Sequence, residues 1–345
     1  MARVHTDSGT FRIPMLGVEY PSLARSIIST EAVLPNVVKD LNFDLVTVTP
    51  YAPFHLVYPL ARKKGIPLIL RIWGIRAAIV FDFIANSGNY LEISRFLPNL
   101  IHNLIQVGLS RSVVTMDCYT SRFLHIISPL KASSLIYPTY AALYKEPLAF
   151  QNQEVAEKFA KDGYIFSIVS LGRTGALFNL QERLLLKILI SIAKRNPQIP
   201  VVIVGGTTAE ARGKLGISIL PKNLYLVGRV FDDSVLRMLY LGARLVVIPV
   251  FFRSLSNRLL EALYYGRPIL TNSTAQTLYA EVSHMDHLFI SDNYTEYPKI
   301  VSELFKDEHS LETLERGAKE AYRSLFSTTR CGLAMEKVIQ ALAQS

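Results

Sequence analysis

A predicted helix over residues 257–265 carries the most informative polar side chains of the sequence. With about 100° between successive residues, its leucines face one way. The opposite face gathers the side chains of Asn257, Arg258, Glu261 and Tyr265. Ser254 and Ser256 precede the helix, and either hydroxyl can cap its first turn. In one interpretation Glu261 accepts hydrogen bonds from ribose hydroxyls, while the loop and the helix N-terminus contact phosphate and sugar. In the other, the polar face is solvated.

Glycines follow two of the predicted strands where a phosphate could approach the backbone. Gly172 and Arg173 come directly after the apolar run SIVSL, and Gly205 and Gly206 follow VIV. Open α/β sheets bind ligands at the carboxyl ends of their strands. An arginine can hold two phosphate oxygens, and free amides at a helix start attract anions. The alternatives are an arginine that caps a solvent loop and a tight turn without a ligand.

Two other polar clusters give weaker indications of chemistry. His284 and His287 flank Asp286, but without further ligands nearby this group is more typical of a surface loop than of a metal site. Asp232 and Asp233 are typical of the N-cap and first turn of the next helix, with a catalytic carboxylate pair as the alternative. We therefore expect no metal site and no cofactor.

The composition indicates a folded chain with about two domains. Its 345 residues suffice for two cores, and 50% hydrophobic residues are not typical of a disordered protein. The net charge of +9 lacks the aromatic and basic interleaving of a nucleic-acid surface, so phosphate-bearing substrates or a membrane surface explain it better. The sequence shows no membrane span and no signal peptide, which favours the cytoplasm, with peripheral membrane contact as an option. Cys118 and Cys331 are expected to be free thiols.

Apolar runs and helical patterns alternate along the second half of the chain. Strands are expected where the runs are rich in Val and Ile, at 167–171, 200–205, 223–227, 245–250, 268–271 and 287–291. Helices are expected between them, at 180–194, 208–214, 234–241, 257–265 and 275–282. The short connections predict a parallel, doubly wound sheet.

The first half shows the same alternation less completely. Strands are expected at 44–49, 67–72, 111–116 and 133–137, with helices at 54–64 and 90–107. This pattern predicts a second Rossmann-like domain. It could be abbreviated, because no clean opening strand followed by a glycine turn precedes it. A linker is expected at 138–153, where the residues become polar.

One apolar stripe in the first half has helical spacing. It consists of Leu97, Leu100, Ile101, Leu104, Ile105 and Leu109. We interpret it as the core-facing side of a helix, and the alternative is a helix that lies in a membrane interface.

The stretch 167–271 resembles the retaining nucleotide-sugar glycosyltransferases with two facing Rossmann-like domains, the GT-B architecture of the family 4-like, group 1 enzymes. The resemblance is carried by SLGR, VIVGG, YLVGRVFDDSVLRMLYLGARLVVIP and LLEALYYGRPIL, in this order. The first half matches loosely, through DLVTVTPYAPFHLVYPLARKKGIPLILRI. The resemblance implies an acceptor-side domain over 1–150, a nucleotide-sugar-binding domain over 151–310, and a helical segment over 311–345 that returns to the N-terminal domain.

The chain departs from the family pattern at three places. In the family, two glutamates separated by seven residues contact the donor; Glu261 matches the one at the ribose, and Arg253 stands in place of the one near the transferred sugar. Arg173 matches an arginine that neutralises the diphosphate, but the following TGALFNL lacks the family's lysine. Where many members have a histidine near the cleft, this chain has Trp73 and Gly74.

The resemblance implies hexosyl transfer from a nucleoside-diphosphate sugar, with UDP or GDP as the nucleotide, to an acceptor hydroxyl with retention of configuration and without a metal. The acceptor would be a glycan, a lipid-linked compound or a small molecule. Arg173 and Arg253 would stabilise the leaving diphosphate. The donor would be bound by Gly172, Gly205, Gly206, Ser254, Ser256, Asn257, Arg258 and Glu261. The departures also fit a second hypothesis, a glycosyltransferase-like binding protein or subunit that turns over poorly or not at all.

Overall fold

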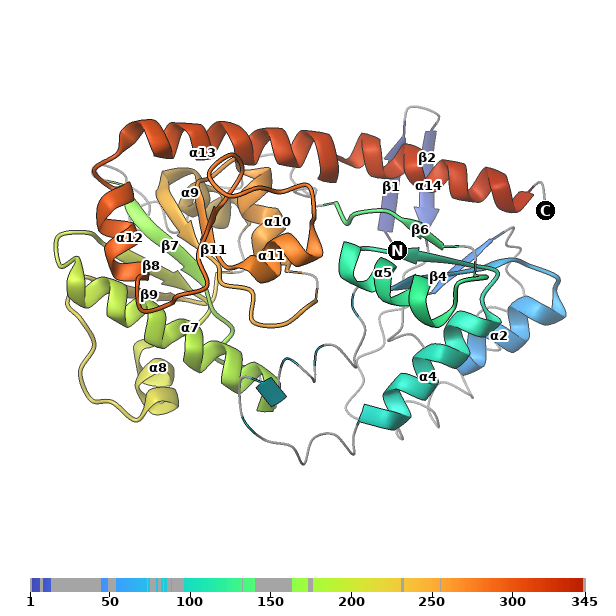
Figure 1. Cartoon of the computed structure of the whole chain (residues 1–345), viewed down its shortest axis with the longest axis horizontal. Helices are drawn as coiled ribbons and strands as arrows, with labels where there is room; N and C mark the ends of the chain where they lie inside the picture. Colours follow the sequence, from blue (N-terminus) through green and yellow to red (C-terminus); the bar gives the residue numbers. More distant parts are fainter. Residues whose placement is uncertain are drawn as a thin grey trace.

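The computed structural model contains two parallel β-sheets side by side, with a long C-terminal helical segment that runs across both (Figure 1). It describes residues 2–6, 9–13, 45–48, 54–72, 74, 79, 82, 84–85, 88, 96–131, 133–139, 163–172, 176–230, 233–254 and 256–343. Helices cover both faces of each sheet. The predicted α/β class with two Rossmann-like domains is confirmed.

The second sheet has six parallel strands in the order β12-β11-β10-β7-β8-β9. The strands are β7 (Tyr164–Ile168), β8 (Val201–Val204), β9 (Leu224–Gly228), β10 (Ala243–Val247), β11 (Ile269–Thr271) and β12 (Phe289–Ile290). The helices are α7 (Ala176–Arg195), α8 (Thr208–Leu215), α9 (Asp233–Gly242), α10 (Asn257–Tyr264), α11 (Ser273–Leu278) and α12 (Tyr297–Leu304). All predicted elements of this half are present, and α12 is additional. β7 begins three residues before the prediction, because its start is marked by buried aromatic rings, Tyr164 and Phe166, instead of Val and Ile.

The first sheet has four parallel strands in the order β3-β4-β5-β6. They are β3 (Val46–Val48), β4 (Leu68–Ile72), β5 (Ser112–Thr115) and β6 (Ser133–Leu135). Among the described residues, three helices accompany them, α2 (Phe54–Lys63), α4 (Phe96–Leu109) and α5 (Cys118–Ile127). The sequence analysis missed α5. Its start is fixed by Asp117, whose carboxylate accepts hydrogen bonds from the Thr120 backbone amide at 2.6 Å and from its hydroxyl at 2.7 Å.

A short antiparallel hairpin at the N-terminus was also missed. β1 (Ala2–Thr6) pairs with β2 (Gly9–Ile13), so that Ala2 lies opposite Ile13 and Thr6 opposite Gly9. The strands mix charged and apolar residues, whereas the sequence criterion was a buried apolar run. From residue 140 on, the predicted linker lies outside the described residues.

The interpretation of α4 as a core-facing apolar stripe is wrong for four of its residues. The side chains of four apolar residues are exposed: Ile101, Leu104, Ile105 and Leu109. The inward side of α4 instead carries Asn103, Gln106, Val107 and Ser110. Helical periodicity separates two faces of a helix but does not say which of them packs, and here the mainly polar face is inside.

The chain ends in a helical segment that joins the two sheets. α13 (Glu308–Ala321) continues through the π-helical turn η2 (Tyr322–Phe326) into α14 (Thr328–Ala343). Cys331 and Val338 of α14 pack against Ile69 of β4 and Val114 of β5, so α14 covers one face of the first sheet. The domain limits at residues 150 and 310 stay a prediction. Both cysteines are free, as predicted, and both are buried. No helix among the described residues is long and apolar enough to cross a membrane.

Candidate functional site

A cavity of about 790 Å³ lies at the carboxyl ends of β7, β8 and β10. It gathers seven of the ten predicted site residues, namely Gly172, Gly205, Ser254, Ser256, Asn257, Arg258 and Glu261. Gly206 and Arg253 are not among its lining residues, and Arg173 lies outside the described residues. Ligand cavities of α/β sheets form at this edge, because the loops after parallel strands meet there.

Helix α10 forms one wall of the cavity. The Ser256 hydroxyl caps its start by accepting a weak hydrogen bond from the Leu259 amide at 3.4 Å. Leu259, Leu260 and Leu263 are buried, as the amphipathic pattern predicts. Tyr265 was placed on the polar face, but it is buried and its ring stacks on that of Tyr240 with a centroid separation of 5.0 Å.

Glu261 points from α10 into a partly apolar environment beside Tyr240. Its Oε2 accepts a hydrogen bond from the Tyr240 hydroxyl at 3.0 Å. Burial raises the pKa of the Glu261 carboxyl, and the Tyr240 hydrogen bond and the charge of Arg258 offset this only in part. A partly desolvated carboxylate with free acceptor capacity suits the binding of vicinal hydroxyls.

Arg258 is held by a buried carboxylate that the sequence analysis did not consider. Its Nη2 lies 2.9 Å from Oε1 of Glu182 on α7 and 3.0 Å from the Ser170 hydroxyl that follows β7. Glu182 is fully buried, lines the cavity, and its Oε2 has no hydrogen-bond partner among the described residues. The ion pair thus fixes a cation at the cavity wall next to the β7 loop.

The two glycines after β8 have structural reasons to be glycine. Gly205 has φ of 103°, and a Cβ there would stand 1.8 Å from the Val169 carbonyl oxygen. A Cβ on Gly206 would collide with the Leu171 side chain at 2.3 Å. The start of α8 is closed by its own capping box, since Glu210 accepts from the Thr207 amide at 2.8 Å. Fewer amides are therefore open to an anion than the sequence suggested, and a donor-binding role for this turn stays a prediction.

Arg229, after β9, is a second cation that sequence reasoning missed. Its Nη2 lies only 2.0 Å from the point where a Cβ on Gly172 would stand, so the guanidinium covers this bare backbone. It pairs with Glu210 at 3.2 Å, and its side chain is 54% exposed. The guanidinium therefore lies next to Gly172, the residue before Arg173 in the sequence.

Arg253 connects the loop after β10 to the first half of the chain. Its Nε lies 2.8 Å from Asp82 Oδ1, its backbone amide donates to Asp82 Oδ2 at 2.6 Å, and its guanidinium stands 4.6 Å from the Tyr119 ring centroid. The side-chain hydrogen bond with Asp82 and the charge of this carboxylate raise the pKa of Arg253. It would reach a diphosphate only if this ion pair opened, so its catalytic role stays a prediction.

Comparison with known proteins adds the fold and a family match over part of the chain. Residues 166–307 match the family described as "Glycosyl transferases group 1". Sucrose-phosphate synthase from Thermosynechococcus elongatus superposes with a TM-score of 0.73 at 15% identity, over 99% of this chain and 86% of that one. A structure described as "Trehalose-6-phosphate from E. coli bound with UDP-2-fluoro glucose" gives 0.65 at 12%, over 93% and 78%. WaaG, "a glycosyltransferase involved in lipopolysaccharide biosynthesis", gives 0.60 at 12%, over 93% and 85%. The chain has the GT-B fold, and part of its second half matches the group 1 glycosyltransferase family. No significant match was found among curated protein sequences.

In this GT-B chain the remaining predicted clusters have structural partners. His284 Nδ1 accepts from the Ile290 amide at 2.9 Å, and Asp286 accepts from the Ser283 hydroxyl at 2.9 Å. Asp233 lies in the first turn of α9, whereas Asp232 is outside the described residues. No group of three metal-ligating side chains occurs in the described part of the chain.

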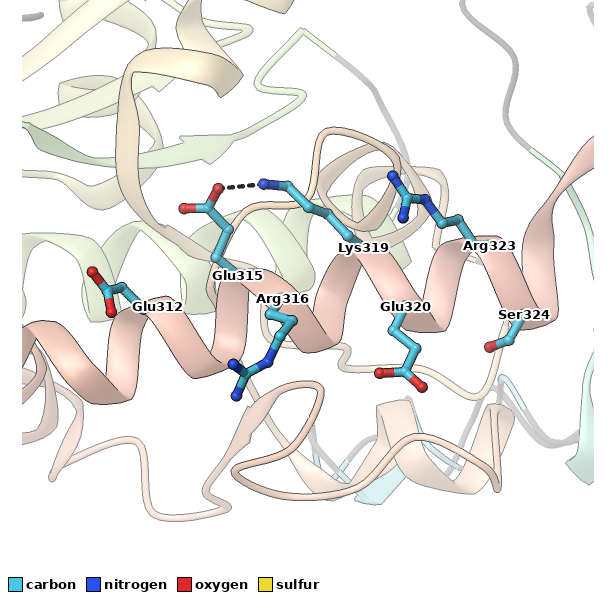
Figure 2. Close-up of a pocket in the computed structure, with 7 residues that line it drawn as sticks. All are labelled: Glu312, Glu315, Arg316, Lys319, Glu320, Arg323 and Ser324. Atoms are coloured by element: carbon cyan, nitrogen blue, oxygen red, sulfur yellow. Dashed lines mark hydrogen bonds and ion pairs between the residues drawn. The ribbon is translucent and has the colours of Figure 1, made fainter.

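A second hollow lies along α13 and η2 and differs from the cavity (Figure 2). Its lining side chains carry both signs of charge, and Lys319 pairs with Glu315 across one helical turn at 2.6 Å. None of its lining residues comes from the carboxyl ends of the strands. Of these two, only the cavity beside α10 lies at the carboxyl edge of the sheet.

The buried Asp117 predicts a pH dependence of stability. Burial raises its pKa from 3.8 to about 6, against the hydrogen bonds from Thr120 that lower it. Between these two values the folded chain holds a proton that the unfolded chain has lost, so the free energy of unfolding should fall as pH rises from about 4 to 6. The expected change is on the order of 3 kcal/mol. Chemical denaturation at several pH values gives the free energy of unfolding as a function of pH. This dependence should be weaker in Asp117→Asn, which keeps an oxygen for the helix cap. An equal slope in both proteins would contradict the prediction.

Proposed function

We propose that this GT-B chain transfers a hexosyl group from a nucleoside-diphosphate sugar, with UDP or GDP as nucleotide, to an acceptor hydroxyl with retention of configuration. The observation that carries the proposal is the convergence of Glu261, Arg258 and Gly172 on one cavity at the carboxyl edge of the sheet. Glu261 would accept hydrogen bonds from the ribose. The start of α10, with Ser256 and Asn257, would face the phosphates.

The chemistry is mainly electrostatic. As the bond between the anomeric carbon and the diphosphate oxygen breaks, negative charge accumulates on the phosphates, and fixed cations stabilise it without reorganisation. Arg173, Arg229 and Arg258 are the cations proposed for this task, and they would replace the lysine that is absent after Arg173. With retention, the acceptor hydroxyl enters on the face that the diphosphate leaves, and a phosphate oxygen takes its proton. These steps use no metal.

A glycan, a lipid-linked compound or a small molecule is proposed as the acceptor, bound on the side of the first sheet. Peripheral contact with a membrane is part of the proposal, because α4 exposes apolar side chains. The second candidate function is a GT-B protein that binds donor without turnover. Arg253 favours this candidate, because it stands where the family has a glutamate. Its guanidinium is also already paired with Asp82.

Nucleotide binding tests both candidates. UDP or GDP is expected to raise the melting temperature in proportion to the logarithm of ligand concentration over Kd, and Glu261→Ala should remove most of the shift. Tyr264→Ala is the matched control, because Tyr264 lies on the same helix, is exposed and does not line the cavity. If no nucleoside diphosphate shifts the melting temperature, both candidates fail. If nucleotide binds but a broad panel of nucleotide sugars and acceptors is neither hydrolysed nor transferred, the non-catalytic candidate stands.

A further inference from the structure

Helix α4 has its polar side inside and its apolar side outside. Gln106 is fully buried; its side-chain oxygen accepts from Asn103 at 3.2 Å, and its backbone carbonyl accepts from the Ser110 hydroxyl at 2.6 Å. The outward side presents Ile101, Leu104, Ile105 and Leu109, which are 40–52% exposed. This arrangement is unfavourable in water, because about half of the apolar surface stays exposed while polar groups are desolvated.

The exposed apolar side chains continue onto the neighbouring helix. Val107 of α4 and Leu124 of α5 pack in the same core cluster, so both helices cover the same face of the first sheet (Figure 1). At the end of α5 and in the turn after it, Ile126 is 77% exposed, Leu130 is fully exposed and Ile127 is exposed as well. We call these seven residues, Ile101, Leu104, Ile105, Leu109, Ile126, Ile127 and Leu130, the apolar face. They make up seven of the thirteen exposed large hydrophobic side chains in the described part of the chain, so the exposure is concentrated.

A basic cavity adjoins the apolar face at Leu109. Residues 54–139 contain nine Lys and Arg against three Asp and Glu, a surplus of six within a chain of net charge +9. Beside Leu109, a cavity of about 630 Å³ is lined by Arg62, Arg111 and Lys131 and by no carboxylate. Burial and the nearby charge of Arg111 lower the pKa of Lys131. Lys131 Nζ also donates to the backbone carbonyls of Gly108, at 3.2 Å, and Ser110, which hold it beside Leu109. An anion in this cavity would offset the unfavourable proximity of the two positive charges.

We propose that the apolar face and this basic cavity together form a docking surface for a bilayer that contains anionic lipid. The apolar side chains enter the boundary between headgroups and acyl chains, and a lipid phosphate lies among Arg62, Arg111 and Lys131. A second copy of the chain fits less well, because both copies would bring the same positive charge to the contact. The inference gives the proposed membrane contact its surface and its lipid class. It rests on that contact and not on sugar transfer.

Vesicle sedimentation of the full chain tests the surface. Phosphatidylcholine vesicles with phosphatidylglycerol are expected to bind the protein at least about tenfold more tightly than phosphatidylcholine alone, and high salt should weaken the difference. The double change Ile101→Ser with Ile105→Ser should lower binding by at least about tenfold. Ile219→Ser is the matched control, since Ile219 is 81% exposed but lies in the second half of the chain, and it should bind as the wild type does. Arg111→Gln should reduce the preference for the anionic vesicles.

Three results would overturn the proposal. In the first, the wild type binds neither kind of vesicle. In the second, the double variant and Arg111→Gln both bind vesicles as the wild type does. In the third, analytical ultracentrifugation shows a wild-type dimer that is lost in the double variant, and the protein does not bind vesicles. Melting temperatures within a few degrees of the wild type establish that the surface variants are folded, and Arg111→Gln keeps the test decisive if the double variant is not. The assay contains no nucleotide. Its failure is therefore distinct from a failure of donor binding.

Discussion

Arg258→Ala should lower the free energy of unfolding by about 3 kcal/mol, because it leaves Glu182 buried without its counter-charge. The two side chains lie 2.9 Å apart, and the Glu182 carboxylate is fully enclosed between α7 and the β7 loop. Water that enters from the adjacent cavity would lessen the cost, which places the expected value at the lower end for a broken buried pair. Urea denaturation at neutral pH measures the change.

A double-mutant cycle separates the lost charge from lost packing. Glu182→Gln alone removes the charge but keeps an oxygen for Arg258, and in the Arg258→Ala background it should restore much of the stability. Arg237→Ala is the control, since Arg237 lies exposed on α9 and does not line the cavity. Additive effects of the two substitutions would show that the ion pair contributes nothing.

Arg173→Ala is expected to slow hydrolysis of the nucleotide sugar by about 30- to 1000-fold, since one charge-assisted contact to the leaving group is worth about 2–4 kcal/mol in the transition state. The substrate is the nucleotide sugar whose nucleotide gives the largest thermal shift, and the measurement is kcat without acceptor. Arg229→Ala should act in the same direction but about tenfold, because half of its side chain is solvated.

Arg212→Ala is the matched control for these two variants, because Arg212 is exposed on α8 beside Glu210 but does not line the cavity. Its rate should equal that of the wild type. If Arg173→Ala and Arg229→Ala hydrolyse and transfer as fast as this control, neither arginine stabilises the leaving diphosphate.

The second sheet could be predicted from the sequence because each strand is covered on both faces. Such strands are rich in Val, Ile and Leu, as in β8, which reads VVIV, and in the LVV that ends β10. The same reasoning missed the β1–β2 hairpin and α5. The start of α5 depends on one carboxylate cap, and the hairpin strands contain charged residues.

Site residues were predictable where a motif fixes them and not where a tertiary contact does. Glu261 follows from the amphipathic pattern of α10, and its place in the cavity agrees with that pattern. Glu182 is a charged residue on the inward side of an apolar helix, and this position indicates a buried partner. The sequence does not identify the partner, because Arg258 is 76 residues away. Likewise, nothing in the local sequence of Arg253 indicates Asp82, which is 171 residues distant. Long-range ion pairs leave no periodic pattern.

The packing of α14 on β4 and β5 also constrains how the chain can fold during synthesis. The first sheet is made early, but the helix that covers Ile69 and Val114 is translated after all six strands of the second sheet. Domains generally fold as units as they leave the ribosome. Here one apolar face of the first sheet stays uncovered until the second unit and α14 have been synthesised. A chaperone that binds apolar surface should therefore bind nascent chains that end before residue 328 and release those that include α14.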